Sequence, residues 1–202
     1  MIEIQNLNKR FHDNNVLNDL CINIKKGESA VIIGQSGTGK SVMLKCLLGL
    51  INPDSGSIKI NSKEIFDKNL KYIKKNNSKV GMLFQGGALF DSLPIWKNIS
   101  FTDLQKKISE KTCRIKSEQT LEKVGLGSEV LDLFPSELSG GMQKRVALAR
   151  AIFPEPDIIF FDEPTTGLDP ITADVINNLI LERVKELGAT ALTITHDMAS
   201  AR

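Results

Sequence analysis

The chain has 202 residues, of which 41% are hydrophobic and 25% are charged, and its formal net charge is +2. This size and composition predict one globular domain, 1–202, with room for an inserted lobe. The nearly balanced charge gives no reason to expect a nucleic-acid partner, and no apolar run approaches the roughly 20 residues that a membrane span needs. Three widely spaced cysteines without metal-ligand grouping indicate reduced thiols in a cytosolic protein.

The first strands are predicted at 2–7, 16–24 and 29–34, where β-branched and apolar residues recur with the period of a strand. Gly27 is expected in a turn between the second and the third. After Gly39 the apolar spacing becomes helical, and it stops at Asn52 and Pro53. The chain therefore begins with a β-rich part that leads into a helix.

Further strands are predicted at 79–84 and 157–163, and the second is apolar enough to be buried on both faces. Helices are predicted at 105–124 and 139–153, and a helix from Pro170 to about Leu187 leads to a last strand at 189–195. Strands that alternate with helices predict an α/β fold, with a mostly parallel sheet covered on both faces. The helical stretch between the strands at 79–84 and 157–163 is interpreted as an inserted lobe.

The segment GQSGTGKS, at 34–41, matches the phosphate-loop pattern G-x-x-x-x-G-K-[ST] between a predicted strand and a predicted helix. Its glycines let the backbone curl so that successive N–H groups converge on phosphate oxygens at a helix N-terminus. Lys40 would reach the outer phosphates, and the Ser41 hydroxyl would complete a Mg²⁺ shell. The predicted nucleotide-binding residues of this loop are Gly34, Gln35, Ser36, Gly37, Thr38, Gly39, Lys40 and Ser41.

Two acidic residues end the buried strand DIIFFDE, and we expect them beside the phosphate loop. Asp162 is predicted to hold Mg²⁺ through water. Glu163, on the opposite side of the strand, is predicted to orient or deprotonate the attacking water, a role worth roughly 10² to 10⁴ in rate. His196 follows the last strand and is placed to contact the γ-phosphate from the other side. This set of residues predicts nucleotide hydrolysis.

A second stretch, LSGGMQKRV at 138–146, offers a hydroxyl, two adjacent glycines and two cations. These groups are also suited to holding a phosphate. One small chain would then carry two phosphate-binding segments.

These motifs resemble those of the ATP-binding cassette ATPases in order and spacing, together with Gln85 in FQGGALF, FFDEP, GLD at 167–169 and ITHD at 194–197. The resemblance covers essentially the whole chain. It implies a P-loop NTPase (RecA-like) core at 1–85 and 157–202, which includes an N-terminal antiparallel β-subdomain, and a helical lobe at 86–156 with the signature motif. It also implies ATP hydrolysis with ATP and Mg²⁺ as cofactors.

In such cassettes two copies pack head to tail, and each signature motif seals the ATP of the other copy. The resemblance would therefore explain why the chain has two phosphate-binding segments. It assigns stacking on adenine to Phe11 and sensing of Mg²⁺ and of the catalytic water to Gln85. It assigns contacts with the opposing copy to Ser139, Gly140, Gly141 and Asp169.

The chain departs from the commonest pattern at Met142, where most members have glutamine, and at Thr166 and Gly167, where many have serine and alanine. These departures, with FQGGALFDSLPIWKNI at 84–99, resemble most the ATPase subunits of the Mla-type and Mkl-type lipid transporters. That resemblance implies phospholipid transport, with an integral-membrane permease and a lipid-binding protein as partners. It places the chain on the cytoplasmic face of the inner membrane.

An apolar cluster follows Gln85 and allows two interpretations. It could be part of the core of the lobe, or it could be a socket for a permease, and both could hold for different members. The cluster consists of Leu89, Phe90, Leu93, Ile95 and Trp96.

An importer of amino acids or other small solutes, or a cell-division ATPase, stays the alternative, because the cassette core differs little among them. A P-loop kinase would have no use for LSGGM, and a GTPase would need an N-K-x-D guanine-binding motif, which the sequence lacks. The chain stops at Arg202, soon after ITHD, where related cassettes continue. We therefore expect a truncated C-terminus, which would leave a sheet edge or a hydrophobic face uncovered.

Overall fold

A parallel sheet lies at the centre of the computed structural model, which describes residues 1–35, 37–73 and 79–196. Its strands follow the order β3 (Ser29–Ile33), β8 (Thr190–Thr195), β7 (Ile158–Asp162) and β6 (Val80–Leu83), and every neighbouring pair is parallel. The first four residues of β7 are buried, as the apolar run predicts. Fully burying each of its two phenylalanines contributes roughly 1.5–3 kcal/mol.

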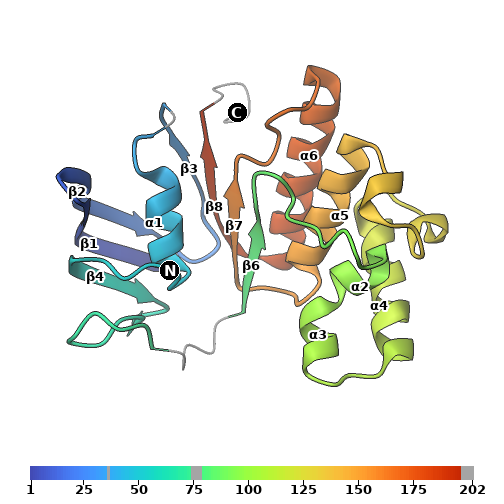
Figure 1. Cartoon of the computed structure of the whole chain (residues 1–202), viewed down its shortest axis with the longest axis horizontal. Helices are drawn as coiled ribbons and strands as arrows, with labels where there is room; N and C mark the ends of the chain where they lie inside the picture. The colour runs from blue at the N-terminus through green and yellow to red at the C-terminus, as the bar shows by residue number, and fades with distance from the viewer. Residues whose placement is uncertain (36, 74–78, 197–202) are drawn as a thin grey trace.

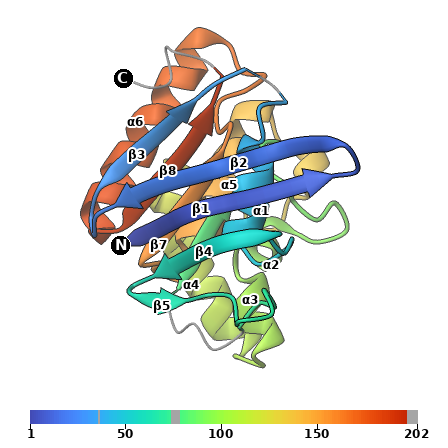
Figure 2. The ribbon, with the colours of Figure 1, turned by 90° about the vertical axis from the view of Figure 1, so that its left-hand side faces the viewer.

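A second, antiparallel sheet is formed mainly by the N-terminal part of the chain (Figure 2). The strands predicted at 2–7 and 16–24 form the long hairpin of β1 (Ile2–Phe11) and β2 (Asn14–Ile24). On the other side of β1 the sheet continues with β4 (Ser55–Ile60) and the short β5 (Lys63–Glu64), which the sequence analysis does not predict. The strand predicted at 29–34 belongs instead to the parallel sheet.

Helices cover both faces of the parallel sheet (Figure 1). Helix α1 (Lys40–Leu47) packs between the two sheets, and its buried residues share a core with Ile158 and Phe160 of β7. Helices α5 (Gly140–Ile152) and α6 (Pro170–Leu187) pack on the opposite face, in a core that contains Ile159 and Phe161. Alternate residues of one strand therefore join two different cores.

The remaining helices form a group beyond α5 (Figure 1), namely α2 (Ile95–Ile99), α3 (Phe101–Gln105) and α4 (Glu110–Lys123), with 3₁₀ turns at Ser128–Val130 and Pro135–Glu137. The prediction of one continuous helix over 105–124 is wrong. Lys107 has a φ of 62°, outside the right-handed helical region. Ser109 then caps a new helix, because its side chain accepts a hydrogen bond from the N–H of Thr112 at 3.2 Å.

This arrangement confirms the predicted α/β fold with an antiparallel β-subdomain and additional helices. The proposed division at 86–156 stays a prediction. Helix α5, which that division assigns to the lobe, shares its buried core with residues of the parallel sheet. No helix in the described ranges has the length and apolarity to cross a bilayer.

Candidate functional site

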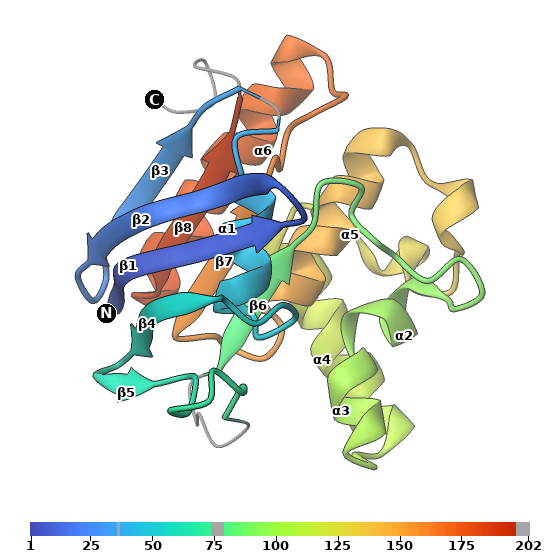
Figure 3. The same cartoon turned by 60° about the vertical axis from the view of Figure 1, so that its left-hand side comes forward.

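The four parallel strands point the same way, so their carboxyl ends lie at one end of the sheet (Figure 3). The predicted catalytic residues follow these strand ends in the sequence. Strand β3 leads into the phosphate loop at 34–41, β6 is followed by Gln85, β7 by Glu163 and β8 by His196. In open α/β sheets, ligands bind at the carboxyl ends of the strands, because the loops that follow the strands converge there. The motifs are far apart in the sequence, and the sheet brings them together.

The phosphate loop requires glycine at position 39, which directly precedes α1. This residue has a φ of 90°, and a Cβ atom placed on it would lie 2.6 Å from the carbonyl oxygen of Val16 in β2. No larger residue fits there without moving the hairpin. Gly37 also has a positive φ, 84°, as the predicted curl of the loop requires. Ser36 lies outside the described residues.

Lys40 lies with its ammonium group inside the loop. Its Nζ donates hydrogen bonds to the carbonyl oxygens of Gly34 at 2.5 Å and Gln35 at 2.7 Å, and lies 3.5 Å from the Thr38 hydroxyl oxygen. The loop therefore places a cation at the N-terminus of α1, where backbone N–H groups favour anions. The exposed Ser41 follows in the first turn of the helix. These residues are suited to binding a nucleotide phosphate, and the Mg²⁺ contact of Ser41 stays a prediction.

Glu163 is the centre of the hydrogen-bonded cluster beside this loop. Its Oε1 lies 2.9 Å from Nδ1 of His196, and its Oε2 accepts hydrogen bonds from Gln85 Nε2 at 3.0 Å and from the Thr166 hydroxyl at 2.9 Å. The backbone of Glu163 has a φ of 48°, which is uncommon for a residue other than glycine. Its N–H donates to the carbonyl oxygen of Ile194 at 2.8 Å, which anchors this turn to β8.

The two neighbouring carboxyl groups have pKa values shifted in opposite directions. Burial raises the pKa of Glu163, but the hydrogen bonds from His196 and Thr166, together with the charges of His196 and Lys40, lower the pKa overall. Burial, and next the charge of Glu163, raise the pKa of Asp162, while the cations Lys45 and Lys40 partly oppose the rise. Opposite shifts in adjacent carboxyl groups are typical of sites where the two groups have different tasks.

The signature stretch, LSGGMQKRV at 138–146, forms the start of helix α5 and lines a second cavity. Ser139 is the N-cap, and its Oγ accepts a hydrogen bond from the backbone N–H of Met142 at 3.3 Å. A Cβ atom on Gly141 would lie 2.9 Å from the Cγ2 of Thr172, so only glycine lets α5 approach α6 this closely. The cavity measures about 540 Å³, and Asp169, the N-cap of α6, also lines it.

The phosphate loop and the signature stretch start helices on opposite faces of the parallel sheet. The core of α1 contains Ile158 and Phe160, whereas the core of α5 contains Ile159 and Phe161. Among the residues that the structure describes, none that lines the signature cavity belongs to the loop at 34–41. The two predicted phosphate-binding segments therefore belong to different sites within one chain.

The family model described as ABC transporter matches residues 17–166, which include the phosphate loop, Glu163 and the signature stretch. The chain belongs to the ABC transporter family. It carries the ATPase domain of that family, which confirms the resemblance stated from the motifs.

The sequence relatives of this ABC domain differ in the substrate that their names give. It is 40% identical over 203 residues to the probable ribonucleotide transport ATP-binding protein mkl of Mycobacterium leprae, a match that covers 100% of this chain and 58% of the relative. It is 42% identical over 198 residues to the methionine import ATP-binding protein MetN of Clostridium tetani, with coverages of 98% and 62%. The chain thus spans less than two thirds of the length of these curated relatives.

Two solved structures confirm the cassette fold. The dimeric, post-hydrolysis structure of the ATP-binding cassette MJ0796 with ADP and Pi has a TM-score of 0.85 at 32% identity, over 100% of this chain and 90% of that one. CbiO1 of Clostridium perfringens, described as part of the ABC transporter complex cbiONQ, has a TM-score of 0.83 at 33% identity, over 97% and 78%.

Phe11 and Met142 are two further residues of the ABC domain that the sequence motifs single out. The Phe11 ring, at the end of β1, is 41% exposed, and the ammonium of Lys9 lies 5.3 Å from its centroid. Because Gly39 touches β2, this hairpin lies beside the phosphate loop, so the stacking role of Phe11 stays a prediction consistent with its position. Met142 is partly buried and packs against the core, and its backbone N–H donates the hydrogen bond to Ser139.

Sequence reasoning missed three contributors to the site. Thr166 was noted only as a departure from the usual pattern, yet its hydroxyl holds Glu163. Lys144 was interpreted as one of the cations that hold a phosphate, and this is wrong. It is buried, and its ammonium donates to the backbone carbonyl of Gln85. Arg150, on the same helix, donates to the carbonyl oxygens of Gly87 at 2.5 Å and Ala88 at 2.7 Å.

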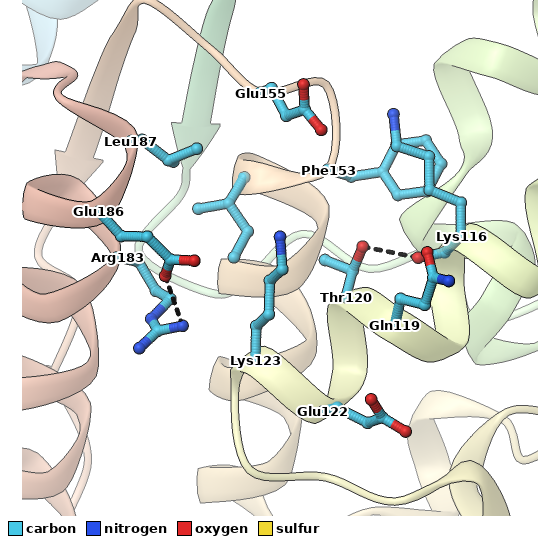
Figure 4. Close-up of a pocket in the computed structure, with 11 residues that line it drawn as sticks. Lys116, Gln119, Thr120, Glu122, Lys123, Phe153, Glu155, Arg183, Glu186 and Leu187 are labelled. Carbon is cyan, nitrogen blue, oxygen red and sulfur yellow. Dashed lines mark hydrogen bonds and ion pairs between the residues drawn. The ribbon is translucent and has the colours of Figure 1, made fainter.

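A further cavity of the ABC domain, about 450 Å³, lies where α4, α5 and α6 end (Figure 4). Apolar side chains of Ile152, Phe153 and Leu187 form part of its wall. The charged side chains around it are balanced in sign. The charged residues are Lys116, Lys123, Arg183, Glu122, Glu155 and Glu186.

Proposed function

We propose that this ABC domain binds and hydrolyses Mg-ATP, with Glu163 as the acceptor that orients and deprotonates the attacking water. The observation that carries this proposal is the position of Glu163 at the carboxyl end of the parallel strands, where three polar neighbours hold its carboxyl group. A glutamate is ionised at neutral pH and can therefore accept a hydrogen bond from water. A carboxylate has about four acceptor positions, so these contacts leave room for a water molecule.

Each residue of this site has a separable part in this proposal. Lys40 would exchange its bonds to the loop carbonyls for bonds to the outer phosphates, and Asp162 and Ser41 would hold Mg²⁺. Mg-ATP supplies the phosphoryl group and a metal that neutralises its charge. Gln85 and Thr166 fix one oxygen of Glu163, and His196 fixes the other. His196 is therefore proposed to orient Glu163 as well as to contact the γ-phosphate.

We also propose that two copies pack head to tail and share two ATP molecules. The support is the placement of the signature cavity and the phosphate loop on opposite faces of one sheet, which prevents both from closing on one nucleotide. In the dimer, Ser139, Gly140 and Gly141 would face the phosphates held by the partner copy, and Asp169 would contact that copy. The dipole of α5 favours an anion at this end.

The test of hydrolysis is phosphate release by the purified chain with ATP and Mg²⁺, with EDTA as the control that removes the metal. Release above the protein-free rate is expected, and it should stop with EDTA. Size-exclusion chromatography of Glu163→Gln with Mg-ATP tests the dimer, because this variant should bind ATP without consuming it. A chain that binds no nucleotide, or stays monomeric with ATP, would refute the respective proposal.

We further propose that the domain works with a membrane permease and moves a lipid. The support is the segment at 84–99, whose sequence resembles the lipid-transporter branch and whose Phe90, five residues after Gln85, is 42% exposed. The cluster that follows Gln85 is divided: Ile95 and Trp96 are core residues, whereas Phe90 is available as a socket for a permease. A lipid-binding partner and a location at the inner membrane face belong to the same proposal.

An amino-acid importer is the second candidate, and the observation in its favour is the 42% identity to the methionine import protein MetN. Deleting the gene separates the two candidates. Lipid transport predicts an altered lipid distribution or increased envelope permeability to detergents. An intact envelope with defective uptake of a soluble nutrient would support the importer.

Alanine at Phe90 and at Trp96 is expected to have different effects. Phe90→Ala removes an exposed ring that stacks on Phe101 with centroids 4.5 Å apart, so it should cost about 1 kcal/mol of stability but uncouple hydrolysis from transport. Trp96 is 6% exposed, and Trp96→Ala should lower the free energy of unfolding by about 3–5 kcal/mol. Chemical denaturation of the isolated chain checks the second effect, and ATPase and transport assays of the reconstituted complex check the first.

A Phe90→Ala complex whose transport still matches its hydrolysis would show that this ring is no part of a socket. Equal destabilisation by the two substitutions would contradict the division of the cluster.

A further inference from the structure

Helix α5 holds the segment that follows β6 through cations on one side of the helix. Lys144 donates to the backbone carbonyl of Gln85, and Arg150 donates to those of Gly87 and Ala88. A Cβ atom on Gly87 would lie 3.5 Å from the Cβ of Ala147, so the segment lies directly on the helix. We call residues 85–88 the tethered segment.

The backbone of the tethered segment turns through conformations that must be stabilised by contacts with other parts of the chain. Gly87 and Ala88 both have positive φ values, 74° and 48°. The second of these is unfavourable for a residue with a side chain, and it persists only where surrounding contacts impose it. The bonds from α5 provide such contacts. The direction of the Gln85 amide is therefore set in part by α5.

Lysine is an unusual residue at a buried position, and only 7% of the surface of Lys144 is exposed. Burial lowers the pKa of Lys144, while the negative charge of Glu163 opposes that shift. Burying an ammonium group is costly, and a methionine of similar length would fill the same space at lower cost. The bond to Gln85 and the attraction of Glu163 are the contacts that offset this cost.

A short path of contacts leads from Lys144 to the proposed catalytic group. Lys144 holds the backbone of Gln85, and the side-chain amide of Gln85 donates to Glu163 at 3.0 Å. Lys144 also lies on the helix that begins after Ser139, five residues earlier, which is about 7.5 Å along the helix axis. One rigid element thus carries both the signature serine and the group that holds Gln85.

We propose that Lys144 is a positioning residue for ATP hydrolysis: it fixes the backbone of Gln85 to α5, so that the Gln85 amide meets Glu163 and follows any shift of the signature helix. This inference rests on the proposed hydrolysis. Lys144 acts through Gln85, whose backbone carbonyl accepts its hydrogen bond. It is therefore expected to affect turnover and to leave ATP binding almost unchanged.

The first test replaces the ammonium with an apolar group in Lys144→Met. We expect kcat to fall roughly 10- to 100-fold, the range found when a residue that orients a catalytic group is removed. The KM for ATP and the affinity for Mg-ATP under non-hydrolysing conditions should stay within about threefold of wild type. Lys144→Arg, which keeps a cationic donor, should recover part of kcat. The matched control is Lys123→Met, which removes an exposed lysine from the end of α4.

The second test combines Lys144→Met with Gln85→Ala. If Lys144 acts through Gln85, the double variant should be no slower than Gln85→Ala alone. If the fold losses in kcat of the two single variants multiply in the double variant, the proposal is wrong. An unchanged kcat in Lys144→Met, or a loss confined to ATP affinity, would also overturn it. If Lys144→Met does not fold, the same comparison is made with Lys144→Arg, whose partial loss must also vanish in the Gln85→Ala background. A wild-type chain without hydrolysis would refute the proposed function as well, whereas an active wild type with additive losses refutes only the role of Lys144.

Discussion

Replacing Lys40 with alanine is expected to weaken nucleotide binding and abolish turnover, whereas Glu163→Gln should retain Mg-ATP binding and lose hydrolysis. Lys40 is the cation inside the phosphate loop, and losing a charge-assisted contact costs about 1.5–3 kcal/mol, or roughly 10- to 100-fold in affinity. Glu163 lies beside the loop and accepts hydrogen bonds, so its replacement should remove the proton acceptor without removing the phosphate contacts. The rate should then fall roughly 10² to 10⁴-fold.

Equilibrium titration with Mg-ATP and single-turnover phosphate release distinguish the two variants. Thermal unfolding of both is the control, because glutamine at 163 also changes the contact with His196. Normal hydrolysis by Glu163→Gln would remove Glu163 as the acceptor. Unchanged ATP affinity in Lys40→Ala would mean that the ammonium stays on its loop carbonyls when nucleotide binds.

Mixing Lys40→Ala with Ser139→Arg subunits is expected to restore pairing that neither variant shows alone. In a mixed head-to-tail dimer, one composite site has an intact Lys40 and an intact Ser139, while the other has both replaced. Homodimers of either variant have two damaged sites. The prediction follows from the placement of the phosphate loop and the signature cavity on opposite faces of the parallel sheet.

The measurement is ATP-dependent association between differently labelled subunits, alone and mixed, by fluorescence transfer. Ser139 also caps α5, so Ser139→Arg should cost about 1 kcal/mol of stability, and its unfolding must be followed in parallel. If the mixture never pairs better than the single variants, the proposed sharing of ATP sites is wrong.

Local signals in the sequence were sufficient for the motifs and for most elements. The phosphate loop was recognisable because its glycines and its lysine follow one another directly, between a strand and a helix. The apolar run of β7 predicted burial on both faces, and Pro170 marked the start of α6. These signals lie within a few residues of one another, so a single sequence contains them.

The interruption at Lys107 and the strand β4 were not predicted, for different reasons. The break depends on one residue with a positive φ and on a serine cap inside a stretch of otherwise helical composition. Strand β4 pairs with β1, which lies some fifty residues earlier in the chain. A strand of that kind becomes stable only when its partner is in place.

The sequence by itself determined that this chain has a phosphate loop, two acidic residues after a buried strand and a signature stretch, because each is a local pattern of residue types. Only the tertiary structure decided which side chains act on one another. It turned Lys144 from a phosphate-facing cation into a buried support of Gln85, and it placed Thr166 on Glu163. It also separated the signature stretch from the phosphate loop by a sheet. The physical reason is that these contacts depend on the order of strands and on the face that each residue takes, which no short segment specifies.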